Sequence, residues 1–315
     1  MSDGERRSRL SADDAFAALG NETRVRILRE LGDAGEPLAF STLYDRLELT
    51  DSSQFNYHLE TLLGHFVHKL DGEYALARPG ERVVEAIQSG TVTGDPELER
   101  TPVESRCSDC DGELSIQWRN GSIELFCGTC ESRWDRSWGR VGSPDDAASG
   151  YLGRLPFPPA GLRNRAPNEV LRAAHVWSTL ELVAVSAGLC PRCSATVDRE
   201  LRVCPDHDDA DGPCPTCHSS FEVRLVADCT NCIATFGAGA VSGLLTAPAL
   251  YAFLFERGLN PLAPEDVDAI DGVLNDYEET VHSTEPLRAE FTLSAGGEEL
   301  TLLVDDSLAV VEHSR

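Results

Sequence analysis

The feature that most constrains this chain is its set of eleven cysteines, most of which occur in pairs with Cys-x2-Cys spacing. A turn with this spacing presents two sulfurs to one point, and two such turns complete a tetrahedral metal site. Cys107 and Cys110 form one pair, Cys127 and Cys130 form the next, and strand-like residues lie between them. These four cysteines predict one zinc ribbon.

The other seven cysteines need an eighth ligand to complete two more sites. His207 stands three positions after Cys204, where the second cysteine of a pair would stand, and CPDH matches the CPRC and CPTC turns. We therefore assign His207 as the twelfth ligand. The predicted metal ligands are Cys107, Cys110, Cys127, Cys130, Cys190, Cys193, Cys204, His207, Cys214, Cys217, Cys229 and Cys232.

The sequence leaves two ways to join the last four turns. Joining them in order along the chain gives ribbon-sized inserts and is the pairing we favour, with 190/193 completed by 204/207 and 214/217 by 229/232. In the alternative, the 190/193 pair joins the 229/232 pair, and 204/207 joins 214/217 between them in the sequence. His218, beside Cys217, is a weaker rival ligand.

Three structural zinc ions are the expected cofactors. An intracellular chain favours metal over disulfides, and iron–sulfur clusters are the minor alternative. Each set has four protein ligands, which leaves no open position for the water or substrate that a catalytic zinc requires. The sequence also lacks a nucleophile with its base and a phosphate-binding loop, so we expect no enzyme.

The charge of the chain is strongly negative, with a formal net charge of −26. Lys69 is its only lysine. This acidic, lysine-poor composition resembles that of proteins from extreme halophiles. In molar salt the Debye length is roughly 3 Å, so the average charge repels DNA only weakly. The acidity is therefore interpreted first as adaptation to solvent.

The beginning of the chain, MSDGERRSRLS, lacks the apolar stretch of a secretory signal, so we expect a cytoplasmic protein. The uncharged residues 233–255 are interrupted by Gly237, Gly239, Gly243 and Pro248. A strand, a turn and a buried helix fit this stretch better than one membrane span.

Short helices and a hairpin are predicted over residues 11–90. NETRVRILREL is an amphipathic pattern that Gly32 can end, FSTLYDRLEL predicts a second helix, and DSSQFNYHLETLLG predicts a third that Asp51 or Ser52 can cap. Asp71 and Gly72 suit a tight turn between two strands, and PGERVVEAIQSG predicts one more helix.

With ALGNETRVRILREL, FSTLYDRL, SSQFNYHLETLLG and FVHKLDGEYAL, this segment resembles the ArsR-like winged helix-turn-helix family, especially halophilic archaeal members with cysteine-rich C-terminal extensions. The resemblance covers about residues 11–90, and NYHLETL is its most specific part. It implies binding of double-stranded DNA by a homodimer. We expect the dimer contact in the helices that flank the winged domain, about residues 11–19 and 79–89, where Val83, Val84 and Ile87 are apolar.

The resemblance also implies which side chains face DNA. Ser53, Gln54, Asn56 and Tyr57 would face the major groove, and Lys69 with the wing would meet phosphate. The chain departs from the family in two respects. The helix expected to read the bases contains no lysine or arginine, and no cysteine precedes Cys107, which disfavours metal sensing within the winged helix.

The expected fold class is α+β. A winged helix-turn-helix domain (1–90) and a linker (91–104) are followed by a zinc ribbon (105–138) and by a last region (139–315). That region would hold a long helix from Pro167 to Gly188, two zinc-knuckle modules, a further helix and a C-terminal β-hairpin.

These features lead to two hypotheses for function. The first is a DNA-binding transcriptional regulator with three structural zinc sites. The alternative is a zinc-ribbon adaptor of the transcription apparatus, whose winged helix and C-terminal region contact protein.

Overall fold

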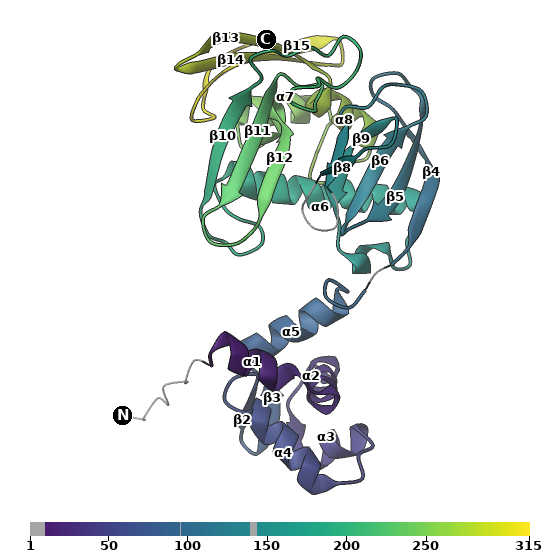
Figure 1. The fold of residues 1–315 in the computed structure, drawn as a ribbon, viewed down its shortest axis with the longest axis vertical. Coiled ribbons are helices and arrows are strands. Elements are labelled where there is room, and N and C mark those ends of the chain that lie inside the picture. The colour runs from purple at the N-terminus through teal and green to yellow at the C-terminus, as the bar shows by residue number, and fades with distance from the viewer. Residues whose placement is uncertain (1–9, 95, 139–143) are drawn as a thin grey trace. The chain divides into compact units, whose positions relative to one another are not determined.

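The computed structural model describes residues 10–94, 96–138 and 144–315, and the chain divides into two compact units, Met1–Asp95 and Pro96–Arg315. The fold is mixed α+β, with helices and small antiparallel sheets in each unit (Figure 1). The coarse fold-class prediction is confirmed. Among the described residues, none of the helices has the length and apolarity needed to cross a bilayer.

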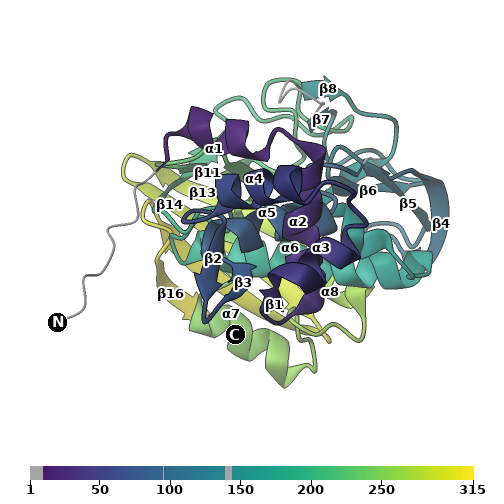
Figure 2. The ribbon, with the colours of Figure 1, turned by 90° about the horizontal axis from the view of Figure 1, so that it is seen from below.

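The N-terminal unit consists of helices packed beside a small sheet. The elements are α1 (Ala12–Leu19), α2 (Glu22–Ala34), β1 (Leu38–Ala39), α3 (Phe40–Arg46), α4 (Ser52–Leu62), β2 (Val67–Leu70), β3 (Glu73–Leu76) and α5 (Arg78–Gln88). The strands pair in the order β1-β3-β2. Figure 2 shows the β2–β3 hairpin beside the helices. Asp71 and Gly72 both have positive φ in the turn of this hairpin, as the sequence predicted.

Caps fix where the helices of this unit begin. The Asn21 side chain accepts hydrogen bonds from the backbone at the start of α2, and Asp51 does the same for α4. Gly32 does not end α2 as predicted, because the helix continues to Ala34 and Gly35 stands after it with φ of 65°. Instead, Gly32 gives α5 room to approach, since a Cβ there would lie 2.8 Å from the side chain of Val84.

The C-terminal unit begins with a four-stranded sheet that supports the first cysteine turns. Its strands pair in the order β4-β5-β6-β9, with bounds β4 (Leu98–Arg106), β5 (Glu113–Arg119), β6 (Ser122–Cys127) and β9 (Tyr151–Pro156). A short ribbon, β7 (Arg136–Trp138) and β8 (Pro144–Asp146), lies between β6 and β9 in the sequence, and η1 (Pro159–Leu162) follows.

This sheet corrects two predicted domain boundaries. Residues 98–104 belong to β4 and are not linker, because they pair with β5. The predicted boundary at 138/139 falls inside one compact unit, because β9 pairs with β6 and completes the same sheet.

Helix α6 (Pro167–Ser186) is the long helix that the sequence predicted, and Gly188 follows it with positive φ. Its buried residues Val170, Leu171 and Ala174 belong to the core under the first sheet. In Figure 1 this helix passes behind both the first sheet and a second one, which has the order β10-β11-β12. The second sheet comprises β10 (Val197–Val203), β11 (Val223–Cys229) and β12 (Thr235–Gly239).

The end of the chain is a larger sheet than the predicted hairpin. After η2 (Ala240–Leu244), α7 (Pro248–Glu256) and α8 (Val267–Asn275), four strands pair in sequence order, β13 (Tyr277–Thr284), β14 (Leu287–Ala295), β15 (Glu298–Asp305) and β16 (Val310–Ser314). Alternate residues of β14 and β15 are buried against α7, in one core with Phe253 and Phe291. The strand, turn and helix predicted over 233–255 are confirmed as β12, η2 and α7.

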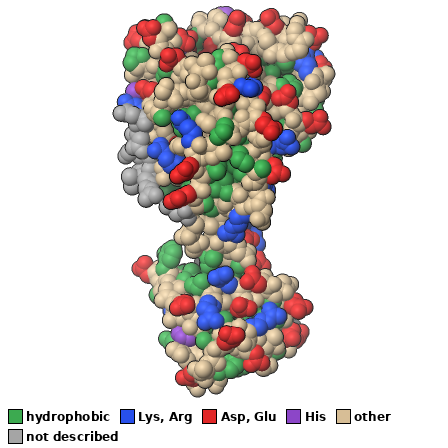
Figure 3. Space-filling view, turned by 90° about the vertical axis from the view of Figure 1, so that its right-hand side faces the viewer, with side chains coloured by type: hydrophobic (Ala, Val, Ile, Leu, Met, Phe, Trp, Pro, Cys, Tyr) green, Lys and Arg blue, Asp and Glu red, His purple; other side chains and the backbone are tan. Residues whose placement is uncertain are grey.

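One face of the chain shows how its charged side chains are distributed (Figure 3). On the face shown in Figure 3, acidic side chains are scattered over each unit, with basic ones between them. A scattered distribution is expected when acidity serves solvation and not one binding site.

Candidate metal centres

All twelve predicted ligands fall into three groups of four, and within each group the ligand atoms lie within 4.8 Å of one another. The first group is Cys107, Cys110, Cys127 and Cys130. The second group is Cys190, Cys193, Cys229 and Cys232. The third group is Cys204, His207, Cys214 and Cys217. The structure therefore contains three groups that could each hold a metal ion.

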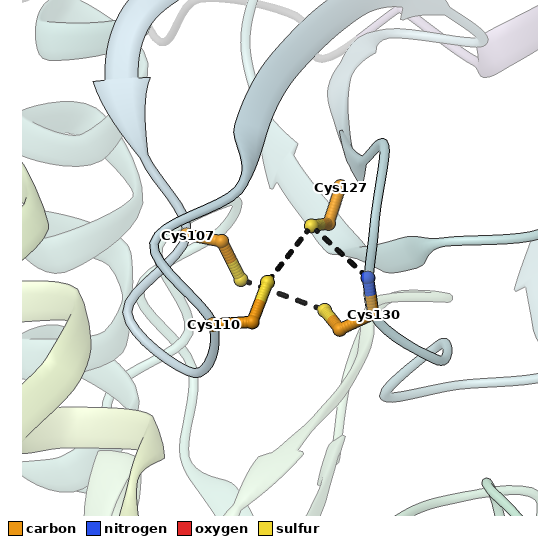
Figure 4. Close-up of side chains that lie close together, drawn as sticks. All are labelled: Cys107, Cys110, Cys127 and Cys130. Atoms are coloured by element: carbon orange, nitrogen blue, oxygen red, sulfur yellow. Dashed lines mark hydrogen bonds between the residues drawn. The ribbon is translucent and has the colours of Figure 1, made fainter.

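The first group is built at one end of the β4-β5-β6 sheet. Cys107 follows β4, Cys110 precedes β5, and Cys127 ends β6. Figure 4 shows the four sulfurs gathered between the two turns. The Sγ atoms of Cys107 and Cys130 are 3.6 Å apart, and those of Cys110 and Cys127 are 3.5 Å apart. Tetrahedral zinc with Zn–S bonds of about 2.3 Å requires sulfurs about 3.8 Å apart, so the donor set fits such an ion.

The second group has the same geometry and is more open to solvent. Sγ–Sγ distances are 3.7 Å for Cys190 with Cys232 and 3.5 Å for Cys193 with Cys229. Cys193 is exposed. The backbone N–H groups of Cys232 and Asn231 donate to the Cys229 sulfur and lower the pKa of this thiol to about 6. A thiolate is the form that binds a metal, and within this turn Cys229 loses its proton more readily than Cys232, whose pKa is raised.

The third group is more enclosed and contains the histidine. Cys204, Cys214 and Cys217 are all buried. Nδ1 of His207 lies 3.5 Å from the Cys217 sulfur, and its Nε2 lies 3.9 Å from a carboxylate oxygen of Asp209. If Nδ1 binds the metal, Nε2 is left to carry the proton and to face this carboxylate, a common arrangement around metal-bound histidines. The N–H of Asp208 donates to Cys214 and lowers the pKa of that thiol to about 6.

The pairing of the turns is nested, so the sequential pairing that we favoured is wrong and the alternative holds. The register of β10 with β11 is the physical reason. Val197 is opposite Cys229, which brings the 190–193 turn next to the 229–232 turn. At the other end of the same strands, Cys204 donates its N–H to the Glu222 carbonyl, beside the 214–217 turn. His218 lies outside the third group, with Nδ1 3.1 Å from Asp135 Oδ2.

A family model described as a domain of unknown function, DUF7351, matches residues 104–310, which is more than half of the chain. The chain belongs to the DUF7351 family. In this DUF7351 member a second model, described as a domain of unknown function, DUF7347, matches residues 12–87. No curated protein and no solved structure matches the chain.

All three groups lie within the DUF7351 match, whereas the predicted DNA contacts lie within the DUF7347 match. Ser53, Gln54 and Tyr57 are exposed on α4, and Lys69 is exposed on β2. Asn56 is half-buried and donates to Glu60 at 2.8 Å, while the Lys69 ammonium lies 4.9 Å from the centroid of the Tyr74 ring.

Two glycines of this DUF7351 chain that were not predicted as site residues shape the first group. A Cβ at Gly112 would lie 3.0 Å from the sulfurs of Cys110 and Cys127. A Cβ at Gly150 would lie 2.0 Å from the Cys127 carbonyl oxygen. The Asp111-Gly112 dipeptide directly after Cys110 was a local signal for a tight turn, whereas nothing near Gly150 in the sequence points to Cys127.

Replacement of His207 tests the third group of the DUF7351 region. We expect His207→Ala to lose one metal ion per chain, because three sulfurs leave the tetrahedron incomplete, and His207→Cys to keep all three. Metal analysis of the purified proteins gives the count. His218→Ala is the matched control and should keep three ions. A wild-type count of two or fewer would contradict the assignment of His207.

Proposed function

We propose that this chain is a DNA-binding transcriptional regulator, in which an ArsR-like winged helix-turn-helix reads DNA and three zinc ions stabilise the C-terminal unit. The observation that carries the proposal is the exposed polar face of α4, formed by Ser53, Gln54 and Tyr57. On the opposite face, Phe55 and Leu59 are fully buried and fix the helix in its unit. A polar helix face held rigidly at the surface suits insertion into the major groove.

The order of elements supports this proposal. α3 and α4 are separated by a short connection, and the β2–β3 hairpin follows α4 directly. In a winged helix, the second helix of such a pair reads bases and the hairpin meets the phosphate backbone. Lys69 on β2 would be the phosphate contact.

The chemistry of the α4 side chains favours base reading over phosphate attraction. Gln54 and Asn56 can each make paired hydrogen bonds to adenine, and a good pair discriminates by about 1–3 kcal/mol. Asn56 would have to give up its hydrogen bond to Glu60 to do so. Because basic contacts are few, affinity should fall less steeply with salt than for a lysine-rich protein.

The test is DNA selection followed by binding measurements in high potassium chloride. With Gln54→Ala and Asn56→Ala combined, we expect preference for the selected site to fall about 10-fold or more, whereas Lys69→Ala should weaken all sequences alike. Thr284→Ala, in the other unit, is the control and should bind as wild type. If the double variant keeps the wild-type preference, or if no fragment is selected, the DNA hypothesis is wrong.

We also propose a homodimer, so that one palindromic site binds two chains. The contact proposed from sequence, around residues 11–19 and 79–89, needs one revision. Val84 is 4% exposed and packs in the core of its own unit, so it is not available to a partner. The exposed Phe16 on α1 and the half-buried Val83 and Ile87 on α5 remain as apolar contacts. The mass of the complex on a palindromic probe tests the stoichiometry.

A protein-binding adaptor is the second candidate, and one observation favours it. Trp177 is 41% exposed and Leu180 is 49% exposed on the same helix, α6, in the C-terminal unit. Large apolar side chains exposed side by side are more common at protein contacts than elsewhere on a surface. Failure of the DNA selection with intact metal sites would favour this candidate.

A further inference from the structure

A short stretch of backbone joins the first metal group to the third. The bridge segment, residues 131–135, begins directly after Cys130 and lies beside residues 218–221, which follow Cys217. The Arg133 carbonyl accepts the N–H of Ser220 at 2.9 Å, and Trp134 pairs with Ser219 as an antiparallel bridge. The rings of Trp134 and Phe221 also pack together, with centroids 5.8 Å apart.

The side chain of Arg133 fastens this bridge segment to the turn of the first group. Asp109, which lies between Cys107 and Cys110, accepts two hydrogen bonds from the guanidinium, from Nε at 3.1 Å and from Nη2 at 2.7 Å. Ser108 of the same turn accepts a further one at 2.7 Å. On the other side, Nη1 donates to Asp271 of α8 at 3.1 Å.

Arg133 is buried, so its ion pairs with Asp109 and Asp271 matter for the stability of the bridge segment. Arg133 is 7% exposed, so its charge depends on Asp109 and Asp271 for compensation. If the first group lost its metal and the 107–110 turn opened, Asp109 would leave the guanidinium. The bridge segment that holds residues 218–221 would then lose its anchor. These residues contact the third group, because the Ser219 carbonyl accepts the N–H of Cys214 at 3.0 Å and lies 3.6 Å from the Cys217 sulfur.

The second group has different connections. Arg192, between Cys190 and Cys193, pairs with Glu181 of α6 at 2.9 Å, and Glu181 also accepts the indole N–H of Trp177 at 3.0 Å. If this group opened, Arg192 would move away from Glu181, and the change would reach α6.

We propose that the first and third groups bind metal cooperatively, with Arg133 as the coupling residue. The proposal rests on the three groups binding metal, as proposed above, and not on DNA binding. By linkage the coupling is reciprocal, so each of the two groups raises the metal affinity of the other by the same factor. Typical couplings of this kind are about 5- to 150-fold.

The test measures metal affinity of the third group when another group is disabled. Cadmium NMR of the full-length chain resolves the sulfur-and-nitrogen third group from the two all-sulfur groups, and competition with a chelator gives its dissociation constant. Cys110→Ser disables the first group. Cys193→Ser disables the second and is the matched control, because both are exposed and each is the second cysteine of its turn.

We expect Cys110→Ser to raise the dissociation constant of the third group about 10-fold and Cys193→Ser to raise it less. Arg133→Gln should reduce the effect of Cys110→Ser, whereas Arg192→Gln should not. Asp271→Asn removes one negative charge from beside Arg133 but keeps an oxygen that can accept the hydrogen bond from Ser108 of the first-group turn. It is a milder second variant for the same double-mutant cycle. An equal effect of the two cysteine variants, or no effect of either, would overturn the coupling. A wild-type chain that binds no metal would overturn the metal sites themselves.

Discussion

Removal of metal with a chelator should unfold the unit Pro96–Arg315 and leave the unit Met1–Asp95 folded. All three groups lie in the C-terminal unit, where they tie together the ends of β4, β5, β6, β10 and β11. A structural zinc contributes about 10–16 kcal/mol of apparent binding free energy, which is as large as the whole stability of a typical domain. The N-terminal unit has its own buried core and no cysteine.

Hydrogen exchange followed by mass spectrometry measures this result unit by unit. After chelation, we expect peptides of β5, β6 and β11 to lose protection and those of α2 and α4 to keep it. The same chelator saturated with zinc is the control and should change neither unit. Loss of protection in both units together would count against independent folding, and protection in both would count against metal as a source of stability.

Features with a local signal could be predicted from the sequence. The turn at Asp71-Gly72 and the start of α6 at Pro167 depend on residues within a few positions of each other. The metal ligands could be predicted for the same reason. A Cys-x2-Cys turn is a local unit, and His207 stands at the same spacing from Cys204. Local spacing determined the twelve ligands but not their partners.

The partners depend on contacts between residues far apart in sequence. Whether 190/193 meets 204/207 or 229/232 depends on the pairing of β10 with β11, which is set across the sheet. The link from Arg133 to Asp271 spans 138 positions. Similarly, β9 completes the first sheet from beyond a separate ribbon, so residues 139–166, rich in Gly and Pro, gave no sign of a strand in that sheet.

Gly150→Ala should disrupt the first metal group although Gly150 is not a ligand. Its φ is 78°, which costs a residue with a Cβ roughly 1–2 kcal/mol. In addition, the new Cβ would lie 2.0 Å from the Cys127 carbonyl oxygen, and the Gly150 carbonyl accepts the N–H of Cys127 at 2.8 Å. The backbone at Gly150 or at Cys127 would have to shift to relieve this contact, and the shift would move the ligand Cys127. Such overpacking costs about 1–3 kcal/mol more.

Gly121→Ala separates these two effects. Gly121 has almost the same φ, 79°, but no atom lies within 4 Å of the position that a Cβ would take there, so only the conformational cost of roughly 1–2 kcal/mol applies. Unfolding by denaturant should therefore show a clearly larger loss of stability for Gly150→Ala, and metal analysis should show a lost ion for this variant alone. Equal losses of stability in the two variants would mean that the positive φ, and not the close contact with Cys127, is the reason that position 150 requires glycine. If Gly150→Ala loses more stability but keeps all its metal, then β6 and β9 move apart without displacing the Cys127 sulfur, and the predicted effect on the metal group is wrong.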